Sequence, residues 1–182
     1  TDRARRRGRR MAEKQSLDFL DPGDVIPRTS ITVQEARDGQ FDGSEIPDDL
    51  QPGDKVLVSA CLVGEEVLWD GCHDLNSPLL AALKEAGAEI IPVCPEILGG
   101  LPCPRPAAEP PRGNGRDVLA GRVPVLGVED GSDMTAEFLE GAWRVVEIAA
   151  KEGARFAFLN ERSPSCGVRQ CHSGGGVAEG PG

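Results

Sequence analysis

Three cysteines occupy positions at which their side chains could converge on one reactive centre. Cys61 directly follows the first predicted strand, Cys94 directly follows the second, and Cys166 lies in the loop after the third. Open parallel sheets bind ligands at the carboxyl ends of their strands, so residues far apart in sequence can be neighbours there. Thiolates grouped in this way hold zinc or iron–sulfur clusters. The positions therefore predict one shared site, with three small core residues as the alternative.

The turns around these cysteines favour an iron–sulfur cluster. They read SACLVG, VCPE and SPSCG, and such turns expose backbone N–H groups that stabilise thiolates. Four cysteines usually hold a [4Fe–4S] cluster, so three would leave one iron free to bind a substrate atom as a Lewis acid. Zinc held by three cysteines and a water is the chemical alternative. The six cysteines include no C-x-x-C pair, which disfavours zinc ribbons and thioredoxin-like motifs.

Alternating strands and helices must position these cysteines. Short apolar runs rich in β-branched residues predict buried strands, and a capped segment with an apolar stripe predicts a helix. The predicted strands are Lys55–Ala60, Ala88–Val93 and Ala154–Leu159, with short ones near Ile31–Val33 and Val123–Val128; the predicted helices are Ser77–Ala86 and Thr135–Glu152. This order predicts an α/β protein: a small Rossmann-like three-layer fold with a mostly parallel sheet and helices on both faces.

Capping residues and one long loop refine this prediction. Asn76 is the expected N-cap of the first helix and Gly87 its C-cap, while Ser132 or Asp133 is expected to cap the second helix. The Pro- and Gly-rich segment 94–116 is predicted to be a loop. Loops of this length in a compact domain usually carry function.

Charge and composition divide the chain in two. Residues 1–53 are predicted to be a basic and polar arm with a loosely ordered extension, and residues 54–182 to be the α/β domain. Residues 1–10 hold six arginines against Asp2, and the net charge of −10 leaves −15 for the remainder. An acidic domain disfavours nucleic-acid binding, although the arm is open to interpretation as a nucleic-acid or lipid tail. Without an apolar membrane segment or signal peptide, the chain is predicted to be cytoplasmic.

Several longer motifs resemble one bacterial family. They are SACLVG, the WDG at Trp69–Gly71, PVCPEILGGLPCPR at Pro92–Arg105, GSDMTAEFLEGA at Gly131–Ala142 and ERSPSCG at Glu161–Gly167. Together and in this order they closely resemble the thiouracil desulfidase (TudS-like) family, from about residue 55 to the C-terminus. The resemblance implies a [4Fe–4S] cluster held by the cysteines of these motifs, which are Cys61, Cys94 and Cys166.

The resemblance also implies a reaction. The open iron takes the sulfur of a thiolated pyrimidine such as 2-thiouracil, and hydrolysis without net electron transfer gives uracil and sulfide. Two alternatives stay open: a non-catalytic iron–sulfur or zinc-binding module, and a desulfidase that acts on a thiolated nucleotide or tRNA. Relatives continue past the Gly-rich segment with another strand and helix. The chain is therefore expected to be truncated, or to have that place filled by a partner, a second copy or the N-terminal extension.

Five further residues are candidates for the chemistry. Glu96, two residues from Cys94, is the expected general base or acid, with capping of loop N–H groups as the alternative. Ser163 and Ser165 are expected to hydrogen-bond substrate or the attacking water, or else to stabilise their turn. Asp70 and Arg105 are expected to contact the pyrimidine edge; a WDG turn and an exposed arginine explain them equally well.

The remaining thiols and imidazoles are predicted to lie outside the reaction. Cys72 and Cys103 are expected to be non-ligands. His73 is expected to lie on a loop surface, with a place in the lining of the pocket as the alternative. Cys171 and His172 form a pair typical of metal sites, but their Gly- and Ser-rich surroundings favour an accidental neighbourhood.

Overall fold

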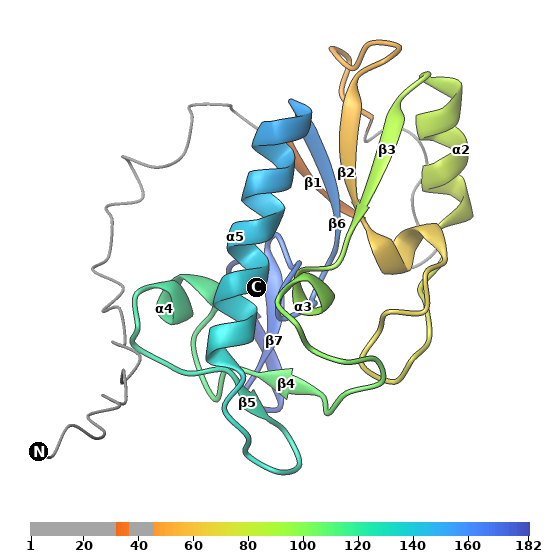
Figure 1. The fold of residues 1–182 in the computed structure, drawn as a ribbon. Coiled ribbons are helices and arrows are strands. Elements are labelled where there is room, and N and C mark those ends of the chain that lie inside the picture. Colours follow the sequence, from red (N-terminus) through yellow and green to blue (C-terminus); the bar gives the residue numbers. More distant parts are fainter. Residues whose placement is uncertain (1–31, 37–45) are drawn as a thin grey trace, which may run out of the picture.

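A four-stranded parallel sheet forms the centre of the protein. The computed structural model describes residues 32–36 and 46–182. Strand order in the sheet is β1–β6–β2–β3, and Figure 1 shows α5 crossing one face of the sheet while α2 lies on its other side. The bounds are β1 (Thr32–Ala36), β2 (Lys55–Ser59), β3 (Glu89–Val93), β6 (Phe156–Asn160), α2 (Ser77–Glu85) and α5 (Thr135–Glu152).

Alternating side chains of the sheet build two cores. On one face Val56, Val58 and the two phenylalanines of β6 pack with Leu79 and Leu83 of α2. On the other face Leu57 and Ala157 pack with Ala149 of α5. Because successive strand residues point to opposite faces, these two clusters require helices on both sides. The predicted three-layer α/β fold is confirmed.

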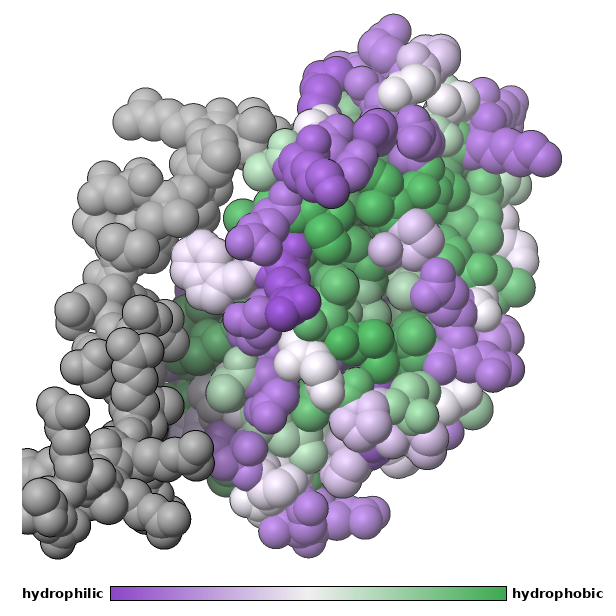
Figure 2. Space-filling view, viewed as in Figure 1, coloured by the Kyte–Doolittle hydropathy of each residue, from purple (hydrophilic) through white to green (hydrophobic). Residues whose placement is uncertain are grey.

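One face of the sheet keeps apolar side chains at the surface. Figure 2 shows them gathered beside α5. The partly buried hydrophobic residues packed against the core on this side are Ile91, Leu98, Val145, Ile148 and Leu159. None of the helices in the described ranges is both long and apolar enough to cross a membrane.

The N-terminal part of the chain supplies an edge strand. The short strand predicted near residues 31–33 is present as β1, and it pairs in parallel with β6 from Thr32↔Phe156 to Ala36↔Asn160. A strand that precedes residue 54 thus occupies this edge of the sheet. The division at residue 54 stays a prediction, and the Arg-rich arm lies outside the described residues.

Helix ends agree with the sequence only in part. Asn76 caps α2 as predicted, since its Oδ1 accepts a hydrogen bond from the Leu79 N–H at 3.0 Å. The C-cap is Ala86 rather than Gly87. The N-cap of α5 is Met134 rather than Ser132 or Asp133. Asp133 nevertheless serves the helix end, because its Oδ1 accepts the Thr135 N–H at 2.9 Å.

The predicted long loop and the C-terminal tail contain short elements. The loop holds α3 (Pro95–Leu98), β4 (Ala108–Glu109) and the start of α4 (Gly115–Leu119). The strand β5 is shorter than predicted, Leu126–Gly127, and it pairs with β4. A 3₁₀ turn, η1 (Ala60–Val63), follows β2. The tail forms a hairpin of β7 (Gln170–Ser173) and β8 (Gly176–Glu179). Its two loop residues, Gly174 and Gly175, both have positive φ, which is the geometry of a tight hairpin turn.

Two glycines let α3 approach α5 closely. A methyl group at Gly99 would overlap the carbonyl oxygen of Glu137, and one at Gly141 would overlap the carbonyl oxygen of Pro95. The backbones of α3 and α5 therefore touch where neither residue has a side chain. This contact fixes the place of the segment that begins at Cys94.

We expect Gly141→Ala to destabilise the protein and lower its activity. Helix propensity alone favours alanine by about 1 kcal/mol, but overpacking typically costs about 1–3 kcal/mol, and here the methyl group meets backbone. Thermal unfolding and activity should be measured beside Glu147→Ala, a change at an exposed position of the same helix. A higher melting temperature for Gly141→Ala would contradict the close contact.

Candidate functional site

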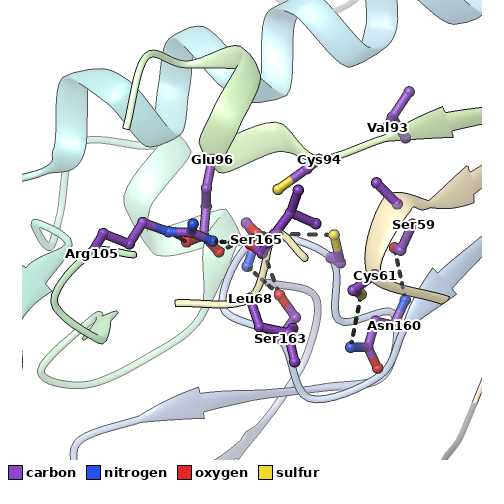
Figure 3. A pocket seen from close by; sticks show the side chains of 13 residues that line it. Ser59, Cys61, Leu68, Val93, Cys94, Glu96, Arg105, Asn160, Ser163 and Ser165 are labelled. Atoms are coloured by element: carbon purple, nitrogen blue, oxygen red, sulfur yellow. Dashed lines mark hydrogen bonds and ion pairs between the residues drawn. The ribbon is translucent and has the colours of Figure 1, made fainter. Parts of the chain in front are cut away.

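Three thiols line one narrow cavity at the carboxyl edge of the sheet. Cys61 lies in η1 after β2, Cys94 precedes α3 after β3, and Cys166 lies in the loop after β6. The cavity volume is about 30 Å³. Figure 3 shows Cys61 and Cys94 approaching it from the ends of their strands. The structure thus brings together the three cysteines that the sequence placed at strand ends.

Burial keeps these thiols protonated in the absence of a metal. Burial, with the neighbouring Cys166, raises the pKa of the Cys61 thiol to about 12. Burial likewise raises the pKa of the Cys166 thiol to about 11, although a hydrogen bond with Ser59 opposes the shift. Burial also raises the pKa of Cys94. Metal binding at these sulfurs would therefore release protons.

Two polar residues that were not predicted from the sequence form hydrogen bonds with the sulfurs or with one another. The Asn160 side-chain amide donates to Cys61 Sγ at 3.3 Å and to Asp74 Oδ2 at 3.3 Å. The Asn160 backbone N–H donates to Ser59 Oγ at 2.9 Å, and Ser59 also hydrogen-bonds Cys166. Both residues end strands, β6 and β2, so the position that identified the cysteines could have identified them too.

The type of ligand atom bears on the choice of metal. In the described parts of the chain, no group of three or more Cys, His, Asp or Glu side chains is arranged to hold a metal ion. Three soft sulfur ligands around one cavity are the donor set of iron–sulfur clusters and also of zinc sites with three cysteines.

A buried ion pair holds the carboxylate beside the thiols. Arg105 Nε donates to Glu96 Oε2 at 2.6 Å, and the side chains are 3% and 12% exposed. Ser165 Oγ donates to Glu96 Oε1 at 2.7 Å, and Figure 3 shows these three side chains meeting beside Cys94. Both oxygens of Glu96 are thus oriented by donors, and a fixed carboxylate is suited to proton transfer.

Arg105 is a framework residue rather than an exposed one. Besides Glu96, its guanidinium donates to the Val67 carbonyl at 2.9 Å and the Pro102 carbonyl at 3.4 Å. Its backbone N–H donates to the Trp69 carbonyl at 2.8 Å. Arg105 therefore joins the segments on both sides of the cavity, and its guanidinium is largely occupied by protein acceptors.

Glu161 fixes the loop that carries Cys166. Its carboxylate accepts backbone N–H groups of Gln170 at 2.7 Å, Arg169 at 3.2 Å and Val168 at 3.3 Å. Burial works to raise the pKa of Glu161, but these backbone hydrogen bonds outweigh it and hold the pKa below its usual value. The charged carboxylate therefore closes the loop from residue 161 to residue 170.

A second, larger cavity adjoins the first. Its volume is about 430 Å³, within the range of small-molecule sites. Five residues line both cavities: Leu68, Glu96, Arg105, Asn160 and Ser163. The larger cavity is also lined by Trp69, Val128 and His172, which were not predicted from the sequence to lie there. A ligand in the larger cavity would lie next to the thiols.

The two predicted serines line the cavities, whereas Asp70 does not. Ser163 lines both cavities and Ser165 the smaller one, with 3.3 Å between their hydroxyl oxygens. Asp70 is exposed, lines neither cavity and accepts the Cys72 N–H at 3.0 Å. This hydrogen bond agrees with the alternative that Asp70 stabilises the WDG turn.

Three thiols and two imidazoles were predicted to lie outside the reaction. Cys72, Cys103 and His73 are exposed, and Cys171 is buried on β7. None of these four lines either cavity. His172, next to Cys171, differs from the prediction because it does line the larger one.

The sequence and the fold of this chain are similar to those of known proteins. A family model described as 2-thiouracil desulfurase matches residues 56–182. The uncharacterized protein YbbK of Bacillus subtilis (strain 168) is 36% identical over 119 residues, which cover 65% of this chain and 77% of that protein. A solved structure of the [4Fe-4S]-dependent thiouracil desulfidase TudS is 40% identical, with a TM-score of 0.59 over 71% of this chain and 80% of that chain. The chain therefore belongs to the 2-thiouracil desulfurase family.

Proposed function

We propose that this protein removes sulfur from a thiolated pyrimidine such as 2-thiouracil. One water enters, and uracil and hydrogen sulfide leave with no net electron transfer. The observation that carries the proposal is the cavity lined by three thiols, which adjoins a cavity large enough for a pyrimidine ring. The family name and the [4Fe-4S] dependence of TudS support the same chemistry.

Cys61, Cys94 and Cys166 are the proposed ligands of a [4Fe–4S] cluster. Such a cluster, when bound by three cysteines, supplies an iron without a protein ligand that acts as a Lewis acid on a thiocarbonyl sulfur. Burial raises the pKa of Cys94, and hydrogen bonds from the backbone N–H groups of Ile97 and Glu96 partly offset this rise. The amide of Asn160 does the same for Cys61. These donors would stabilise the thiolates that bind iron.

Glu96 is the proposed general base. Arg105 and Ser165 hold its two oxygens, and each carboxylate oxygen keeps a lone pair with which to accept a proton from water. Ser163 lines both cavities and can hydrogen-bond that water or the substrate. In this proposal Arg105 orients Glu96. The sequence had suggested a different role for Arg105, direct contact with the pyrimidine edge.

The charges of the larger cavity favour an uncharged substrate. Four acidic residues line it against two arginines, and one of these, Arg105, is paired with Glu96. Acidic surroundings repel phosphate groups. This disfavours the alternative of a thiolated nucleotide or tRNA, for which the only strongly basic segment is residues 1–10, outside the described residues.

The test is desulfuration by the anaerobically reconstituted protein. Sulfide release should be measured with 2-thiouracil, with its nucleoside 5′-monophosphate, and with thiolated tRNA, using the full chain and a chain without residues 1–10. We expect release from the free base at a rate that the deletion does not change. Cluster-loaded protein that releases no sulfide from any of these substrates would contradict the enzyme and leave the non-catalytic module.

A further inference from the structure

An exposed tryptophan lies at the larger cavity. Trp69 is 52% exposed, although an indole ring normally gains free energy by burial. Its backbone carbonyl accepts the Arg105 N–H at 2.8 Å, so its position is tied to the arginine that holds Glu96. The adjacent residue, Leu68, lines both cavities. Trp69 is therefore fixed within reach of a ligand beside the thiols.

The surroundings of Trp69 suit a flat ring with polar edges. Among the large hydrophobic side chains exposed in the described ranges, only Trp69 and Val128 line this cavity. Val128 is 59% exposed. The other lining includes Glu109 and His172, which can accept or donate hydrogen bonds at the edge of a heterocycle. The cavity thus combines apolar surface for a ring face with polar groups for ring N–H and C=O.

We propose that Trp69 is the stacking surface for the pyrimidine ring. The inference rests on the proposed function and adds a residue that determines specificity for planar heterocycles. An aromatic face binds a base by stacking, and removal of the aromatic ring weakens binding by about 5- to 150-fold. Phenylalanine keeps a stacking face, so Trp69→Phe retains most of the affinity, whereas Trp69→Ala loses it.

The chain offers a direct spectroscopic test. It has two tryptophans and no tyrosine, and Trp143, 40% exposed on α5, lines neither cavity. In cluster-loaded Trp143→Phe protein, Trp69 is the remaining tryptophan, so all tryptophan fluorescence comes from it. Titration with uracil, the non-reacting product, is expected to quench this emission. The quenching should saturate over the same range of uracil concentration in which equilibrium dialysis shows binding. In Trp69→Phe, whose only tryptophan is Trp143, uracil is expected to leave the emission unchanged.

Kinetics supply the second measurement. Trp69→Ala is expected to raise KM for 2-thiouracil and Kd for uracil by about 5- to 150-fold with unchanged iron content, and Trp143→Ala to change neither. Uracil binding that leaves Trp69 emission unchanged, or an unaltered KM in Trp69→Ala, would overturn the stacking role while desulfuration stands. Wild-type protein that neither binds uracil nor consumes 2-thiouracil would overturn the proposed function, and the stacking role with it.

Discussion

Cys166→Ala is expected to lose cluster binding and desulfuration together. Cys166 is buried at the cavity with Cys61 and Cys94, and two cysteines cannot replace the three that the proposed site requires. After anaerobic reconstitution with iron and sulfide, the parent protein should hold about four irons per chain and absorb near ~400 nm. The alanine variant should show neither property and should release no sulfide from 2-thiouracil.

A second cysteine provides the matched control for this loss. Cys72 is exposed and lines neither cavity, so Cys72→Ser should keep the parent iron content and rate. Circular dichroism of the cluster-free proteins should show that Cys166→Ala still folds, since replacing a buried cysteine with alanine removes only one sulfur atom. If Cys166→Ala keeps four irons and full activity, the assignment of this ligand is wrong. Stoichiometric zinc in the parent would instead support the metal module.

Glu96→Gln is expected to lower kcat by about 10²- to 10⁴-fold, the usual contribution of a general base. Glutamine keeps the size of the side chain, and its carbonyl oxygen can still accept one hydrogen bond from Arg105 or Ser165. It cannot take a proton from water. Iron content should equal that of the parent, because Glu96 is not among the proposed ligands. Rates must therefore be compared per assembled cluster.

Stability has to be measured alongside these rates. The change removes one charge of a buried ion pair, and breaking such a pair typically costs about 3–5 kcal/mol. Glu140→Gln serves as the control, because it breaks the pair of Glu140 with Arg144, whose side chains are both 53% exposed. Undiminished desulfuration by cluster-loaded Glu96→Gln protein would show that another group is the base. If the loss of activity in Glu96→Gln is equal to the fraction of protein that is unfolded at the assay temperature, the role of Glu96 is structural.

The sequence predicted what local patterns determine. Apolar β-branched runs located β2 and β3 to within a residue, and the apolar stripe located α5 from Thr135 to Glu152. Because cysteines follow the ends of such strands, their shared edge could be inferred without coordinates. The four-residue helix α3 was missed, since so short a helix has no periodic pattern to detect.

Contacts between distant segments could not be predicted in the same way. The hydrogen bond between Asn160 and Cys61 joins residues 99 positions apart, and the one between Ser165 and Glu96 joins residues 69 apart. Arg105 was expected either at the substrate or exposed at the surface, where an arginine usually lies. Its burial depends on carbonyl acceptors that only the folded loops provide.

Because the three cysteines are far apart along the chain, the proposed cluster would also stabilise the folded protein as a cross-link. Cys61, Cys94 and Cys166 come from three segments that are joined only by the finished sheet. A cluster bound to all three would act as a staple that closes two large loops of the chain, and a cross-link of this kind disfavours the unfolded state by about 3–5 kcal/mol per loop in the chain-entropy model. The sheet must form before the staple can be inserted. Oxidative loss of the cluster would remove the cross-links of both loops at once. Damage to the cluster would therefore also lower the free energy of unfolding of the protein.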